Sequence, residues 1–74
     1  MITEDFKVKS YSKSTLAKLY NPDVSEASAR RLLRSWIARN KELGNELRLL
    51  HFSPASHVLT PLQVETIVKY LGEP

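Results

Sequence analysis

Arginines recur in the middle of the chain at a spacing that would gather guanidinium groups on one side of a helix. Arg30, Arg31 and Arg34 lie within five residues. A step of about 100° per residue puts Arg31 and Arg34 opposite an apolar stripe on the same helix, with Arg30 toward the flank. A guanidinium group can bind a guanine edge or a phosphate through two parallel hydrogen bonds. The spacing therefore predicts a surface for an anionic partner.

Two further residues could support such a surface. Ser28 lies on the flank of the same helix, where a small side chain permits close approach to a groove, and Lys13 could bind a phosphate. Asp23 and Glu26 count against DNA, because they precede the arginines and carboxylates repel phosphates. An exposed helix face is usually charged in any case, so the alternative that these cations are only solvated stays open.

Catalytic and metal chemistry has little support. The two histidines, His51 and His57, have no Cys, Asp or Glu at a spacing that would complete a metal site. The serines lack a base in a pocket, and the two glycines form no phosphate-binding loop. We therefore expect a binding protein, not an enzyme, with no cofactor and no metal.

Length and composition indicate a single helical domain over residues 1–74. The net charge is +3, and residues 25–50 hold the whole excess of positive charge. The chain has no cysteine, which excludes disulfides and favours a reducing compartment. Its acidic start is unlike a signal peptide, and its apolar runs are too short to span a bilayer. We expect a soluble cytoplasmic protein without membrane contact.

Capping residues and apolar spacing predict the first two helices. The first runs from about Lys13 to Tyr20, with Ser12 as its N-cap. The second begins after an N-cap at either Ser25 or Asp23, of which Asp23 has a glutamate at capping-box spacing. The apolar stripe expected to bury the second helix comprises Ala29, Leu32, Leu33, Trp36 and Ile37.

Two more helices follow. The third begins near Asn40, and residues 51–59 are predicted to form a loop. The fourth begins with a capping box between Thr60 and Gln63 and stops at Gly72, where a left-handed conformation is expected. The apolar residues expected on the buried sides are Leu43, Leu47 and Leu50 in the third helix and Val64, Ile67, Val68 and Leu71 in the fourth.

The predicted fold class is all-α, a small four-helix domain whose first two helices form a helix-turn-helix-like pair. Such a pair needs a small residue inside its first helix so that the second can cross closely, and Ala17 has this position. Val24, in the turn over residues 21–25, is expected to point inward. Ala29 and Leu32 are expected to face the first helix.

The N-terminal segment favours an extended conformation. Before Ser10, Phe6 and Val8 alternate with lysines, as the two faces of a strand would. Tyr11 belongs to no apolar stripe and is the aromatic residue expected to be exposed. Trp36 shares the stripe of the second helix and is expected in the core.

The leading functional hypothesis is a DNA-binding or regulatory domain of helix-turn-helix type, with a homodimer left open. Arg31 and Arg34 are central to it, and Arg30, Lys13 and Ser28 support them. The alternative is a protein-interaction adaptor that uses an exposed apolar strip of the last helix. Salt dependence separates the two, because DNA binding releases counterions and an apolar interface does not.

The chain also resembles a family of short, uncharacterised proteins from gut anaerobic bacteria, classed as a domain of unknown function. The residues that carry the resemblance are Phe6 with Ser10-Tyr11-Ser12-Lys13, Leu16-Ala17 with Tyr20 and Pro22, Ala29-Arg30 with Leu33 and Trp36-Ile37, Thr60-Pro61 with Gln63-Val64, and Leu71-Gly72-Glu73-Pro74. The resemblance implies a bacterial helical domain and assigns no site residues.

Overall fold

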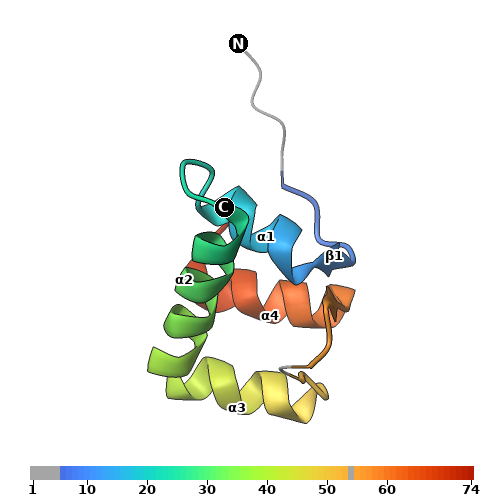
Figure 1. Cartoon of the computed structure of the whole chain (residues 1–74). Coiled ribbons are helices and arrows are strands. Elements are labelled where there is room, and N and C mark those ends of the chain that lie inside the picture. Colours follow the sequence, from blue (N-terminus) through green and yellow to red (C-terminus); the bar gives the residue numbers. More distant parts are fainter. Residues whose placement is uncertain (1–5, 54) are drawn as a thin grey trace.

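A computed structural model describes residues 6–53 and 55–74 and folds them into four helices and one two-stranded antiparallel ribbon (Figure 1). The acidic start of the chain, residues 1–5, lies outside the described residues. The prediction of four helices is confirmed. The elements in chain order are β1 (Tyr11–Ser12), α1 (Lys13–Tyr20), α2 (Glu26–Arg39), α3 (Lys41–Leu49), β2 (Val58–Leu59) and α4 (Pro61–Leu71).

Each helix begins at a side-chain oxygen that accepts a hydrogen bond from the backbone N–H three residues later, which satisfies one of the donors that a helix start leaves without a partner. Ser25, and not Asp23, caps α2. The predicted capping box of α4 is present, with Thr60 and Gln63 each bonded to the other's backbone N–H. The four N-caps are Ser12, Ser25, Asn40 and Thr60.

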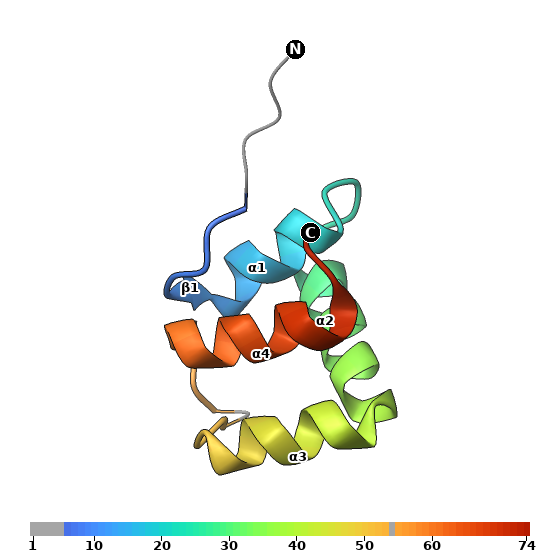
Figure 2. The same ribbon diagram turned by 180° about the vertical axis from the view of Figure 1, so that it is seen from behind.

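The helices surround one core. Helices α1, α4 and α3 lie one below another in that order, and α2 runs along one side of this stack (Figures 1 and 2). Ala17 and Ala29 are fully buried, so small residues let α1 and α2 approach closely. The hydroxyl of Tyr20 donates to the carbonyl of Gly72 at 2.5 Å and ties α1 to the end of α4. The buried apolar residues are Leu16, Ala17, Ala29, Leu33, Leu43, Leu47, Leu59, Val64 and Ile67.

Two predicted inward residues point elsewhere. Leu32 is 37% exposed, because the buried face of α2 centres on Ala29 and Leu33 and the side chain of Leu32 falls on its flank. Val24 is 36% exposed. The ammonium group of Lys18 donates to the carbonyl of Val24 at 2.6 Å and so links α1 to this turn. The half-buried Trp36 packs against the edge of the core.

The extended segment lies later in the chain than the alternation before Ser10 indicates. Residues 6–10 form no strand, whereas Tyr11 pairs with Leu59 in the β1–β2 ribbon. The ribbon corrects the expectation that residues 51–59 form only a loop. It also corrects the expected exposure of Tyr11, which is half-buried and stacks on the ring of Phe6 at 5.5 Å. Long-range pairing of this kind has no local sequence signal.

Candidate nucleic-acid interface

Three of the predicted site residues share the outer surface of α2. Arg30, Arg31 and Arg34 are exposed and are called the arginine face from here on. Within residues 6–53 and 55–74 there is one ion pair, between Lys69 and Glu46 at 3.7 Å, so no described carboxylate pairs with these guanidinium groups. The arginine face therefore keeps its hydrogen-bond donors available to a ligand.

Ser28 serves the start of α2. Its backbone N–H donates to the hydroxyl oxygen of Ser25 at 3.2 Å, and its own hydroxyl accepts from the Ser25 hydroxyl at 3.0 Å. The residue is half-buried and lies close to Glu26, one turn before the arginine face. The structure thus gives Ser28 a capping role, and any contact with a ligand would be secondary to it.

Lys13 lies near the arginine face but is already engaged. Its ammonium group donates to the carbonyl of Ser53 at 2.6 Å and lies 4.5 Å from the centre of the Phe52 ring. Burial lowers the pKa of Lys13, and the positive charge of Arg34 lowers it further. The repulsion shows that the fold brings Lys13 and Arg34 close together although they lie far apart in the sequence. Lys13 therefore contributes positive charge near the arginine face, but its ammonium group already has a hydrogen-bond partner within the protein.

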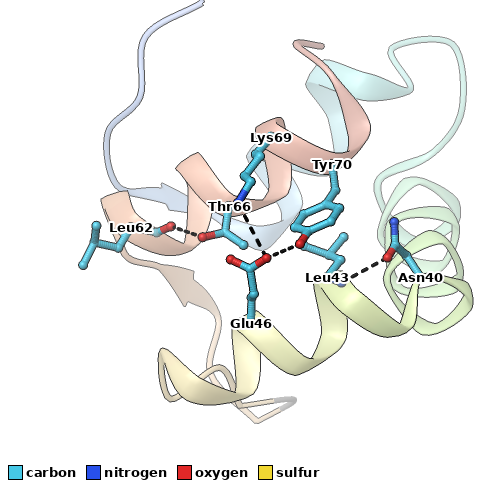
Figure 3. Close-up of polar contacts among 7 residues, drawn as sticks. All are labelled: Asn40, Leu43, Glu46, Leu62, Thr66, Lys69 and Tyr70. Atoms are coloured by element: carbon cyan, nitrogen blue, oxygen red, sulfur yellow. Dashed lines mark hydrogen bonds and ion pairs between the residues drawn. The ribbon is translucent and has the colours of Figure 1, made fainter.

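The carboxylates of α3 face away from the arginine face. The carboxylate of Glu46 accepts a hydrogen bond from the hydroxyl of Tyr70 and lies 3.7 Å from the ammonium group of Lys69, so that it links α3 to α4 (Figure 3). The hydrogen bond to Glu46 raises the pKa of Tyr70 to about 12. Glu42 lines a wide hollow beside Trp36 and Leu71 on this same side.

A groove lies on the other side of α3, between it and α2. We call it the α2–α3 groove; its volume is about 630 Å³. Arg48 and Lys41 are its cations, and no carboxylate lines it. Lys41, at the start of α3, also borders the hollow on the opposite side. Both cations belong to the excess of positive charge in residues 25–50, but the sequence did not indicate that they share a site. The residues that line the groove are Ile37, Ala38, Asn40, Lys41, Gly44, Asn45, Arg48 and Phe52.

The candidate site offers hydrogen-bond donors and positive charge on the arginine face and in the α2–α3 groove. Over residues 6–53 and 55–74, no group of three or more His, Cys, Asp or Glu side chains could hold a metal ion. No helix in the same ranges has the length and apolar character needed to cross a membrane. What the arrangement can do chemically is bind anions through guanidinium, ammonium and amide groups.

Comparison with known proteins identifies one family. No curated protein and no solved structure matches the chain. A family model described as a domain of unknown function (DUF4248) matches residues 7–74 and so covers nearly the whole chain, α1 to α4 included. The resemblance to a family of unknown function is confirmed at that level, and the bacterial source stays a prediction. The chain belongs to the DUF4248 family.

Proposed function

We propose that this domain binds duplex DNA, without catalysis, through the arginine face of α2. The observation that carries the proposal is that Arg30, Arg31 and Arg34 are exposed together, with no described carboxylate paired to any of them. Ala27 and Ala38 on the same side of α2 are also exposed and small, so they leave room for the wall of a DNA groove. Arginine is the residue that pairs with guanine edges and phosphates through two bonds.

The packing of α1 against α2 supports a helix-turn-helix-like docking. A short turn, residues 21–25, separates the two helices. Helices α1 and α2 pack against each other, and Ala17 and Ala29 are fully buried, so the arginine face is held outward before any ligand binds. A recognition helix needs this pre-organisation, because binding otherwise costs the entropy of ordering it.

The carboxylates near the start of α2 limit where the duplex can lie. Asp23 and Glu26 are exposed at the N-terminal end of the helix, where they would repel a phosphate. Arg31 and Arg34 lie farther along. The DNA therefore contacts the middle of α2, with Arg31 and Arg34 toward the duplex and Arg30 on the flank.

The adaptor hypothesis has less support. It needs an exposed apolar strip on α4, but Val64 and Ile67 are fully buried there. Among the described residues of α4, the one exposed large apolar side chain is Leu62, at 60%. A single leucine is a common feature of protein surfaces and defines no interface.

Replacement of two arginines tests the proposal. R31A/R34A should keep its helical circular dichroism, because both side chains are exposed and Ala is the better helix former. Its affinity for a generic duplex, measured by fluorescence anisotropy, should fall by about 1–3 kcal/mol for each base that an arginine side chain binds in the wild type. The control is R39A/K69A, which removes the same charge outside the arginine face. If R31A/R34A binds as tightly as this control, the arginine face is only solvated.

A further inference from the structure

Helix α3 separates its charges by side. Lys41 and Arg48 line the α2–α3 groove, and Asn45 lies between them. Glu42 and Glu46 belong to the opposite side, where Glu46 binds Tyr70. No cation and carboxylate of α3 are three or four residues apart, which is the spacing at which side chains pair along a helix. Among the described residues, neither Lys41 nor Arg48 forms an ion pair.

The α2–α3 groove is lined by both apolar and polar residues. Gly44 contributes no side chain, and the half-buried Ile37 and Phe52 form the apolar base and wall. Lys41 and Arg48 are exposed at the rim. They lie two helical turns apart, which places their Cα atoms about 10.5 Å apart along the helix axis.

Residues of the groove lie close to cations outside it. Phe52, in the groove wall, lies 4.5 Å from the ammonium group of Lys13. The charge of Arg34 is close enough to lower the pKa of that ammonium group. On α2 itself, Arg34 precedes the groove residue Ala38 by one turn. Lys13 beside Phe52 and Arg34 one turn before Ala38 therefore place positive charge next to the groove.

We propose that the α2–α3 groove holds the sugar–phosphate backbone of the duplex, with Lys41 and Arg48 bound to phosphates and the Asn45 amide as a further donor. This inference rests on the proposed function and extends it to a second helix. A phosphodiester backbone fits because it is a line of regularly spaced negative charges, and the groove offers cations two helical turns apart with no carboxylate lining the space between them. Contacts of this kind position a protein on DNA and carry no sequence information.

The test compares K41A/R48A with wild type and with R39A/K69A. Each double variant removes two cations. In the control, Arg39 lines the hollow beside Glu42, and Lys69 of α4 pairs with Glu46. The control therefore leaves the groove cations Lys41 and Arg48 in place. Duplex affinity is measured by anisotropy over a range of salt concentrations, with duplexes of several sequences. Removal of two phosphate contacts should lower the magnitude of the log–log salt slope by about 2. At ~0.1 M salt the affinity of K41A/R48A should fall tenfold to a hundredfold, equally for every sequence.

The outcomes separate the groove from the arginine face. A K41A/R48A salt slope and affinity equal to those of R39A/K69A, alongside weakened binding by R31A/R34A, overturn the groove assignment and leave the arginine face in place. Wild type without salt-dependent affinity for duplex DNA overturns both. Circular dichroism checks the fold of each variant. If K41A/R48A fails to fold, K41Q/R48Q keeps long side chains without the charge, and the same decrease in slope is expected.

Discussion

The two sides of α3 use charge in different ways. On the side toward α4, the Glu46 carboxylate binds the Tyr70 hydroxyl and lies near the ammonium group of Lys69 (Figure 3). On the side toward α2, Lys41 and Arg48 line a groove that contains no carboxylate. The same short helix thus has one side whose charges are satisfied within the protein and one side whose charges are not.

This difference separates the charges that take part in contacts within the fold from those that form no described ion pair. The contact between Lys69 and Glu46 is largely exposed, and such pairs contribute little to stability. The hydrogen bond from Tyr70 to Glu46 and that from the Gln63 amide to the carbonyl of Leu50, the C-cap of α3, are further polar links between α3 and α4. On the other side no described ion pair depends on the Lys41 or Arg48 charge, so these cations can be removed without breaking a salt bridge of the fold.

The largest loss of stability is expected from a substitution in the core, which α3 contacts through Leu47. Leu47 is fully buried, and Leu47→Ala should cost about 2–5 kcal/mol, a large fraction of the stability of a domain this small. Urea denaturation followed by circular dichroism measures the loss. Leu49→Ala is the matched control on the same helix, because Leu49 is 80% exposed and should change stability by less than about 0.5 kcal/mol. Equal midpoints for the two variants would contradict the core assignment.

A smaller loss of stability is expected when the hydrogen bond on the α4 side of α3 is removed. Tyr70→Phe removes the hydrogen bond to Glu46 and should lower stability while leaving DNA affinity unchanged. The pKa of Tyr70 is raised to about 12 from its ordinary value of 10.0, so the hydroxyl stabilises the fold fully below pH 10 and ceases to do so as pH rises to 12.

Denaturation midpoints between about pH 9 and pH 12 measure this dependence. Wild type should become less stable across the upper part of the range, and Tyr70→Phe should change less. Some decline should persist in the variant, because burial also raises the pKa of Tyr20 to about 12. The same decline in both proteins would show that the Tyr70 hydroxyl does not link α3 to α4.

The smallest change in stability is expected at Gly44, which lines the α2–α3 groove. A Cβ at Gly44 would lie 3.8 Å from the carbonyl oxygen of Ile37, an ordinary contact distance. Gly44→Ala should therefore raise stability by about 0.5–1 kcal/mol, because Ala is the better helix former. The urea midpoint measures the gain. A lower midpoint than wild type would mean that α2 and α3 must approach more closely than the groove geometry shows.

The helices and their starting residues were predictable because their signals are local. The capping box of Thr60 and Gln63 identifies α4 from a few consecutive residues, and the stripe through Ala29 and Leu33 identifies α2. The start of α2 was less predictable from the sequence, because Ser25 and Asp23 both fit the pattern of an N-cap. The structure shows that Ser25 is the cap. Periodicity also assigned Leu32 to the core, because a helical wheel does not show how wide a face the neighbouring helices cover.

The candidate site was predictable only in part. The exposure of Arg31 and Arg34 follows from helical spacing alone. The engagement of Lys13 by Ser53 and Phe52 does not, because it joins residues far apart in the chain. The α2–α3 groove likewise depends on how α3 is rotated against α2. The seven-residue spacing of Lys41 and Arg48, which places both along one side of α3, was the signal available in the sequence.

The salt dependence of duplex binding by the wild-type protein tests the central claim most directly. Arg31, Arg34, Lys41 and Arg48 are the cations assigned to the DNA surface. Fluorescence anisotropy with a generic duplex from ~50 to ~300 mM salt should give a linear log–log plot with a slope of about −3 to −4, if each cation displaces one counterion. A slope near zero, or no binding at the lowest salt concentration, would contradict the claim that this positive surface binds DNA.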